Sequence, residues 1–410
     1  MASILLLTHE FPPFRGGIGT YACQLAAAAC RLGHIVTVAA PDYGRDRTEE
    51  DRVRYPYRVL RFRGEAYTDR SLPALILRDH RLVRGEFDVI HAVDWPNTLA
   101  LGMLNKVRCT PFVATVYGTE ILGSARSRLI TAIGARRLFE VPDRILAISE
   151  FTKDLLLTNF PGVERDRVDV TLPGVSPYWF ADASGCPCPR LEYGIPRDDR
   201  VILTASRLDR VILTASRLDR RKGHRLALRS LALLSDGLRE RLSYVIAGDG
   251  GDPEYLRELR TLADASGVQV VFTGDVSDET LRGLYHTASV FCMPGEPHPK
   301  KVEGFGLVFL EAAAQGLPSI TSDIGAVTEA VRHEATGLVV PPMNAPALAA
   351  ALARLLGDEP LRSGMGRNAR SHARAFTWER CAAATYGPVG LPPTPARNPA
   401  RHAVPLAARS

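Results

Sequence analysis

Two glutamates eight residues apart, Glu303 and Glu311, are the side chains whose type and spacing most suggest chemistry. The stretch after Glu303 begins with the glycine turn 304–306, continues as an apolar run that contains Glu311, and ends at Gly316 with Pro318 beyond it, which is typical of a short helix. Glycines ahead of a helix N-terminus let backbone N–H groups approach an anion. Glu311 would lie about 7.5 Å along that helix. The pattern predicts carboxylates on both sides of an anion site, which suits a nucleotide diphosphate sugar.

The residues after Glu311 favour such a site over the alternative, in which Glu311 lies on a solvated helix face and the glycines only form turns. Residues 318–322 have the pattern of a short buried strand, residues 323–326 that of a turn, and Glu329 falls on a further helix. Strand, loop and helix in this order place loops at the carboxyl ends of parallel strands, where open α/β sheets bind ligands.

The segment EGFGLVFLEAAAQGLP, followed by GAVTEAV and TGLVVPP, resembles the donor-site signature of the retaining glycosyltransferases of family 4. PPFRGGIGTYACQLAAAACRLGHIVTVAAP near the N-terminus resembles the first motif of the same family. The resemblance extends over roughly residues 4–386. It implies the GT-B fold, in which two Rossmann-like α/β domains with parallel sheets face each other across a cleft.

The resemblance also implies which residues bind a nucleotide diphosphate sugar. SRLDRRKGH is similar to the family's diphosphate clamp, in which arginine binds in a planar, two-pronged manner and lysine acts as a point charge. We therefore predict Arg217, Lys222 and Glu303 as the catalytic residues, with Glu303 on the hydroxyls of the donor sugar. Glu311 would bind the ribose, and the loop at Val276 the base. The predicted donor-binding residues are Gly16, Gly17, Asp249, Val276, Phe305, Gly306, Leu307 and Glu311.

The predicted reaction is transfer of a sugar, with retention, to a hydroxyl of a glycan, a lipid-linked molecule or a small molecule. The motif VEGFGLVFLEAAAQGLP is most similar to mannosyltransferases that act on lipid-linked or cell-envelope acceptors, so GDP-mannose is the first expectation for the donor. UDP-glucose and UDP-N-acetylglucosamine are alternatives. No cofactor or metal is expected for donor binding. A non-catalytic nucleotide-sugar-binding protein and a UDP-sugar epimerase of related fold remain open.

A tandem duplication precedes the clamp, since VILTASRLDR occurs unchanged at residues 201–210 and 211–220. A parallel sheet needs one such strand, and only the second copy leads into the clamp lysine. We therefore predict that Val211–Ala215 lies in the sheet, and that the first copy forms an extended linker or a marginal edge element.

Alternating strand and helix patterns in the first half predict a parallel sheet with helices on both faces. Polar residues follow several of its strands, where they commonly serve a cleft. His91, although assigned to the acceptor side, could equally be a buried core histidine. The family usually has histidine where this chain has Tyr117, and tyrosine cannot act as an acid or base near neutral pH. The predicted acceptor-side residues are His91, Asp94, Tyr117 and Glu120.

The predicted domain organisation follows the breaks in this pattern. Residues 1–172 form the acceptor-side domain, a proline-rich linker spans 173–200, and the nucleotide-sugar-binding domain spans 201–375. A helix at 376–386 would cross back to the first domain, and the proline-rich segment 387–410 would be a disordered tail.

Composition narrows the functional classes. The net charge of +6, with 23% charged and 46% apolar residues, describes a globular protein and gives no reason to expect a nucleic-acid partner. Seven cysteines without zinc-like spacing fit a reducing cytoplasm. We expect neither a signal peptide nor a membrane-spanning segment. Two basic patterns suggest peripheral contact with the inner face of a membrane: Leu72–Arg84, and the set Arg126, Arg128, Arg136 and Arg137. Solvated charged helix faces would give the same patterns.

Overall fold

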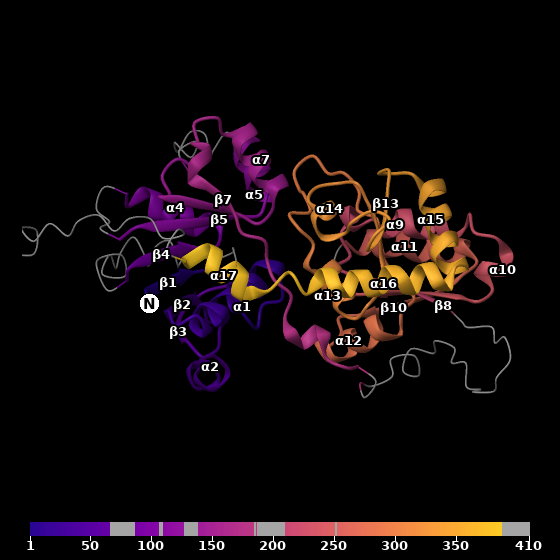
Figure 1. Cartoon of the computed structure of the whole chain (residues 1–410), viewed down its shortest axis with the longest axis horizontal. Coiled ribbons are helices and arrows are strands. Elements are labelled where there is room, and N and C mark those ends of the chain that lie inside the picture. The colour runs from indigo at the N-terminus through magenta and orange to yellow at the C-terminus, as the bar shows by residue number, and fades with distance from the viewer. Residues whose placement is uncertain are drawn as a thin grey trace, which may run out of the picture.

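The computed structural model describes residues 1–65, 87–105, 110–126, 138–183, 186, 210–250 and 252–387. These residues form two α/β units, each built on one parallel sheet with helices packed against it (Figure 1). The strands are short and apolar, and those at Phe112–Val116 and Val290–Met293 are buried along their whole length. Such continuous burial is expected of parallel strands that are covered on both faces. The predicted fold class is confirmed.

The first sheet has seven strands in the order β3-β2-β1-β4-β5-β6-β7. The order reverses at β1, which pairs with both β2 and β4, so the carboxyl ends of β1 and β4 border a ligand crevice. The strands are β1 Ser3–Leu7, β2 Ile35–Pro41, β3 Arg58–Phe62, β4 Val89–Ala92, β5 Phe112–Val116, β6 Arg144–Ala147 and β7 Val168–Val170. The helices are α1 Gly17–Arg31, α2 Thr48–Arg54, α4 Trp95–Met103, α5 Thr119–Arg126 and α7 Glu150–Asn159, with 3-10 turns at Arg165–Arg167 and Pro177–Phe180.

The second sheet has six strands in the order β10-β9-β8-β11-β12-β13, with its reversal at β8. The strands are β8 Arg210–Ala215, β9 Leu242–Ala247, β10 Gln269–Gly274, β11 Val290–Met293, β12 Ser319–Ser322 and β13 Gly337–Val340. The helices are η5 Arg220–Lys222, α9 His224–Leu231, α10 Asp236–Arg239, α11 Pro253–Ser266, α12 Asp278–Thr287, α13 Leu307–Ala314, α14 Val327–Ala330, α15 Ala345–Gly357 and α16 Glu359–Ala373.

The duplicated segment enters the sheet through its second copy, as predicted. Strand β8 pairs with β9 on one side and β11 on the other, and its residues Val211, Ile212 and Leu213 are almost completely buried. Of the first copy, residues 201–209 lie outside the described residues, so their predicted position as a linker or edge element stays a prediction.

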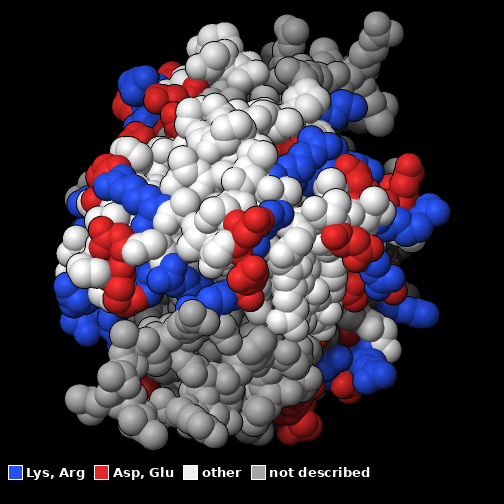
Figure 2. Space-filling view, turned by 90° about the vertical axis from the view of Figure 1, so that its right-hand side faces the viewer, with Lys and Arg blue, Asp and Glu red and all other residues white. Residues whose placement is uncertain are grey.

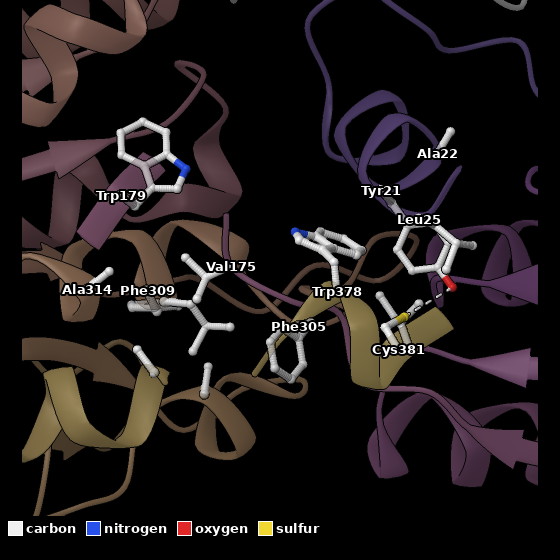
Figure 3. Close-up of a cluster of buried hydrophobic side chains, with 14 of the residues drawn as sticks. Tyr21, Ala22, Leu25, Val175, Trp179, Phe305, Phe309, Ala314, Trp378 and Cys381 are labelled. Carbon is white, nitrogen blue, oxygen red and sulfur yellow. Dashed lines mark hydrogen bonds between the residues drawn. The ribbon is translucent and has the colours of Figure 1, made fainter. Parts of the chain in front are cut away.

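The last described helix, α17 Trp378–Tyr386, packs against α1 of the first domain. Its Trp378 ring meets the Tyr21 ring edge-on, with centroids 5.6 Å apart. Trp378, Val175, Phe305 and Tyr21 belong to one buried cluster that takes side chains from both domains (Figure 3). The two stretches of chain that connect the domains are themselves paired, since the Val175 amide donates to the Phe376 carbonyl at 3.0 Å.

The surface of the described residues carries mixed charge. On the face shown in Figure 2, Lys and Arg side chains are interspersed with Asp and Glu. Within the described part of the chain, no helix has both the length and the apolar character needed to cross a membrane. The predicted basic segment at 72–84 and Arg128, Arg136 and Arg137 lie outside the described residues, so membrane contact stays a prediction.

Candidate active site

Loops that follow β8, β11 and β12 meet at one edge of the second sheet, because these strands are parallel neighbours. The first loop carries Lys222, the second Glu303, and the third Gly325. A pocket of about 230 Å³ opens there, lined by Arg221, Glu296, Pro297, His298, Lys301, Val302, Glu303, Ile324 and Gly325. The fold therefore brings together two of the three predicted catalytic residues.

Glu303 lies between two cations. Its Oε2 accepts from Arg221 Nη1 at 2.6 Å and from Lys222 Nζ at 2.7 Å, and all three side chains are at least 85% buried, since the highest exposed fraction is 14%. Burial by itself would raise the pKa of Glu303, but the charges of Lys222 and Arg221 outweigh it and lower the pKa to about 2. Glu303 is therefore an ionised acceptor at neutral pH, and the cluster of the three residues carries one net positive charge.

The turn that holds these cations is fixed by its own polar contacts. The Asp219 side chain accepts from the Arg221 amide at 3.0 Å and from Lys301 Nζ at 2.9 Å. The Arg221 carbonyl accepts from the Glu296 amide at 2.8 Å. Although burial opposes it, the Lys301 hydrogen bond contributes to lowering the pKa of Asp219 to about 2. Backbone and side-chain contacts thus hold the cations at the pocket.

Arg221 is a site residue that the motif comparison missed. The clamp was assigned to Arg217 and Lys222, but Arg221 is the arginine that contacts Glu303. The Arg217 side chain is exposed and makes no hydrogen bond to another described residue, so its contact with the donor stays a prediction. The run Arg221-Lys222-Gly223 was the available signal, although sequence alone could not show which arginine points inward.

Helix α13 begins at the pocket, with Gly306 as its N-cap in the left-handed region at φ +86°. Glu311 projects from this helix, and the Tyr285 hydroxyl donates to its Oε2 at 3.3 Å. Burial raises the pKa of Glu311 to about 7, and the Tyr285 hydrogen bond opposes this only in part. The two glutamates of the motif therefore differ in charge near neutral pH, because one meets two cations, whereas the other is desolvated by burial and lies near the Tyr285 hydroxyl and the Asp278 carboxylate. Phe305 is buried and packs near Phe376, so what it offers a ligand is its backbone.

The predicted nucleotide-base loop contacts the first domain. Arg15 Nη1 donates to Asp275 Oδ1 at 2.8 Å and to the Val276 carbonyl at 2.9 Å. Arg15 directly precedes Gly16 and Gly17, so the glycine loop and the base loop touch across the cleft. Asp249 is exposed at the end of β9 and bonds the amide of Gly250 at 2.6 Å. Contacts of Gly16, Gly17, Asp249 and Val276 with a donor stay predictions.

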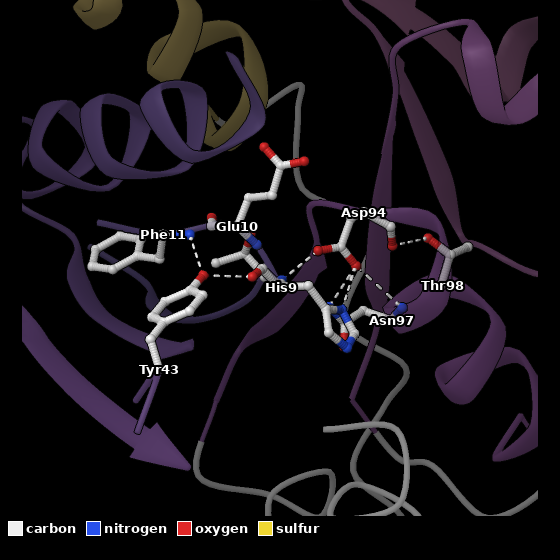
Figure 4. Close-up of polar contacts among 8 residues, drawn as sticks. His9, Glu10, Phe11, Tyr43, Asp94, Asn97 and Thr98 are labelled. Atoms are coloured by element: carbon white, nitrogen blue, oxygen red, sulfur yellow. Dashed lines mark hydrogen bonds and ion pairs between the residues drawn. The ribbon is translucent and has the colours of Figure 1, made fainter. Parts of the chain in front are cut away.

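Asp94 lies inside the first domain, against His9 in the loop that follows β1. It is 1% exposed, accepts from the His9 amide at 2.5 Å and from Asn97 Nδ2 at 2.6 Å, and lies 3.2 Å from His9 Nδ1. Figure 4 shows His9 and Asn97 directed at Asp94, while the Glu10 carboxylate points away from them. Asp94 thus connects the ends of β1 and β4 by hydrogen bonds, a positioning role that the motif did not reveal.

His91 occupies the core position that was the alternative to an acceptor contact. It is fully buried, with Nδ1 2.5 Å from the Tyr386 hydroxyl and Nε2 2.7 Å from Thr115 Oγ1. Burial lowers the pKa of His91 to about 3, so it is neutral under ordinary conditions. Assignment of His91 to the acceptor side is therefore corrected: it joins β4 to α17 and β5.

Tyr117 and Glu120 lie on one turn of the first domain, which packs against the second. The Glu120 carboxylate accepts from the backbone amides of Tyr117 and Gly118, and burial raises its pKa despite these bonds. This turn lies against the second domain, because a Cβ on Gly304 would stand 2.2 Å from the Tyr117 carbonyl oxygen. Contact of either side chain with an acceptor stays a prediction.

Comparisons with known proteins agree with this geometry. The family profile described as "Glycosyltransferase Family 4" matches residues 15–178, and the profile described as "Glycosyl transferases group 1" matches residues 197–372. A "GDP-mannose-dependent alpha-(1-6)-phosphatidylinositol monomannoside mannosyltransferase" of Mycobacterium tuberculosis is 30% identical over 412 aligned positions, covering 93% of this chain and 97% of the relative.

Solved structures share the fold at lower identity. A sucrose-phosphate synthase of Thermosynechococcus elongatus superposes with a TM-score of 0.74 at 22% identity, covering 94% of this chain and 97% of that one. The Anabaena protein HepE in complex with UDP-glucose superposes with a TM-score of 0.70 at 18% identity, covering 93% and 97%. With two parallel-sheet domains, a carboxylate–cation cluster at their cleft and these full-length matches, the chain belongs to glycosyltransferase family 4 and has the GT-B fold.

Proposed function

We propose that the protein is a retaining mannosyltransferase that moves mannose from GDP-mannose to a hydroxyl of a lipid-linked or glycan acceptor. The observation that carries the proposal is the placement of Glu303 between Lys222 and Arg221 at the start of α13. A donor of this class requires cations for its diphosphate and an acceptor of hydrogen bonds for its sugar hydroxyls within a few ångströms of each other. The mannose and GDP assignment is supported by the name of the mycobacterial relative.

In the proposed mechanism, the protein stabilises the charge that develops on the leaving diphosphate. Lys222, Arg221 and the backbone N–H groups at residues 305–307 supply positive potential, while Glu303 orients the donor sugar. Preorganised donors of this kind commonly provide the largest single part of catalysis. Glu311 would bind the ribose; with a pKa near 7 it could donate or accept a hydrogen bond there. Closure of the two domains would exclude water from the donor.

The acceptor is proposed to be an alcohol carried by a lipid or glycan on the cytoplasmic side of the membrane. The mycobacterial relative is named for a phosphatidylinositol monomannoside acceptor, which supports a lipid-linked class. Donor binding is proposed to need no metal, so activity should persist in excess EDTA.

A donor panel tests the proposal. The protein is incubated with GDP-mannose, UDP-glucose and UDP-N-acetylglucosamine, with and without a membrane-lipid extract, and nucleotide release and the anomeric configuration of the product are measured. Acceptor-dependent release of GDP with an α-linked product supports the proposal. Release from a UDP-sugar overturns the donor assignment, a changed sugar without transfer indicates an epimerase, and binding without turnover indicates a non-catalytic protein.

A further inference from the structure

Helix α7 of the first domain begins at the cleft, and its N-terminal amides need partners. The first N–H groups of a helix have no carbonyl within the helix to bond. Ser149 is the N-cap, and its Oγ accepts from the Thr152 amide at 3.0 Å. The amides of Glu150 and Phe151, which come first in the helix, are bonded by neither Ser149 nor any other group of α7.

A residue of the second domain accepts hydrogen bonds from both of these amides. Glu329, on α14, accepts from the Glu150 amide through Oε2 and from the Phe151 amide through Oε1, each at 3.0 Å. Figure 1 places α14 next to α7, at the edge of the second domain that faces the first. A carboxylate that accepts from two backbone amides at a helix N-terminus also interacts favourably with the helix dipole. Glu329 therefore completes the cap of α7 from across the cleft.

The segment that carries Glu329 also holds the backbone of Glu303. The Ala326 amide donates to the Glu303 carbonyl at 3.0 Å. Gly325 has φ +59°, and a Cβ there would stand 2.4 Å from the same carbonyl oxygen, so only glycine allows this approach. Five residues, 325–329, thus connect the backbone of the proposed donor-sugar ligand to the first turn of α7.

The ion pair of Arg15 with Asp275, which also joins the two domains, is a contact of a different kind. Arg15 and Asp275 have side chains that are 63% and 61% exposed, and exposed pairs contribute little. The Glu329 contact instead uses backbone groups fixed by a helix and a side chain that is partly buried. It is therefore better suited than the exposed Arg15–Asp275 pair to hold one definite geometry.

We propose that Glu329 is a positioning residue for glycosyl transfer, which secures the Gly325–Ala326 turn against Glu303 when the two domains are closed. The effect on glycosyl transfer rests on the proposed function, whereas the cap of α7 does not. The inference predicts that loss of the carboxylate loosens the first turn of α7 and slows turnover, while nucleotide contacts within the second domain remain intact.

Amide hydrogen exchange of the full chain tests the cap directly. Glu329→Gln keeps the size of the side chain but turns its NH₂ group toward one of the two amides. We expect the peptide containing Glu150 and Phe151 to exchange about five- to tenfold faster, the size of effect that loss of a helix cap has. Glu334→Gln is the matched control. It removes the same charge, but Glu334 pairs with Arg354 inside the second domain rather than with α7.

Kinetics with the donor found by the panel test the positioning role. Glu329→Gln should lower kcat about five- to tenfold and change the donor KM less than twofold. Glu334→Gln should keep the wild-type rate. If Glu329 had only a structural role, its loss would instead lower the fraction of active protein and the Tm. Unchanged exchange in Glu329→Gln overturns the cap, and faster exchange with unchanged kcat overturns the positioning role. Equal effects of both variants overturn the inference as a general charge effect. A wild type that releases nucleotide from no donor contradicts the proposed function, while the exchange experiment still decides the cap.

Discussion

Replacing Glu311 with glutamine should stabilise the protein at alkaline pH and not at acidic pH. Burial raises the pKa of Glu311 from 4.5 to about 7. Between these values the folded protein keeps a proton that the unfolded chain has already released, so the free energy of unfolding falls as the pH rises. Below pH 4.5 the carboxyl is protonated in both states and contributes no such effect. Glutamine fills the same space and never ionises.

The size of the effect follows from the two pKa values. Each pH unit between them corresponds to about 1.4 kcal/mol. Ionising Glu311 should therefore cost about 3 kcal/mol of stability at pH 8, about 2 kcal/mol at pH 6 and almost nothing at pH 4. Glu311→Gln should remove this dependence, so its stability relative to the wild type should rise by about 3 kcal/mol from pH 4 to pH 8.

Urea denaturation at several pH values from 4 to 8 measures this difference, with a melting curve as a second readout. Glu303→Gln is the control of opposite sign, since the pKa of Glu303 is lowered to about 2. Its charge stabilises the fold above pH 4.5 and loses that effect as the pH falls toward 2, so Glu303→Gln should be destabilising at neutral pH and less so in acid. A Glu311→Gln variant whose relative stability does not change with pH would refute the reasoning.

Three further predictions concern the donor site and the duplication. Lys222→Ala should lower nucleotide release at least about a hundredfold with the fold retained, because a charged transition-state contact is lost; near-normal release would remove Lys222 from the site. Gly17→Ala meets no atom within 4 Å, so it should keep the wild-type Tm and raise the donor KM if this loop faces the diphosphate; Gly16→Ala would stand 2.3 Å from Glu10 Oε2, the end of a flexible side chain that can move, so it too should keep the wild-type Tm. Deleting residues 201–210 places Arg200 before Val211 and should preserve the melting temperature and activity; an unfolded product would show that the first copy has a structural place.

Much of the fold followed from periodicity. The apolar run Val290–Met293 and the short segment Ser319–Ser322 were predicted as strands and are buried strands of a parallel sheet, and Gly and Pro mark the loops around them. The choice between the duplicated copies also followed from sequence, because only one copy leads directly to Lys222. Placement of the domains against each other did not follow, since it depends on contacts such as Val175 with Phe376, between residues two hundred positions apart.

For the candidate site, the motifs gave residue positions but not side-chain directions. Lys222 and Glu303 were identified by motif and lie together. Arg221 was missed because a motif does not record side-chain direction: of the three consecutive basic residues, Arg221 and Lys222 both reach Glu303, whereas Arg220 pairs with Glu258. His91 lies near the end of β4 and Asp94 just beyond it, where polar residues often face a ligand, but His91 bonds Thr115 of β5 and Tyr386 of α17, and Asp94 bonds His9 and Asn97. Position at the end of a strand therefore indicates the neighbourhood of a site and does not distinguish its ligands from its supports.

The two glutamates of the motif illustrate why spacing alone could not assign their tasks. Glu303 precedes α13, where the loop after β8 brings Lys222 and Arg221 to it, so its charge is maintained at any working pH. Glu311 lies in the second turn of the same helix, where it meets the Tyr285 hydroxyl and no cation, so its charge varies around neutrality. Environments that separate the pKa values of two like groups give them different roles. A fixed negative charge suits orientation of sugar hydroxyls beside a diphosphate clamp, whereas a group that can donate or accept suits a ribose diol.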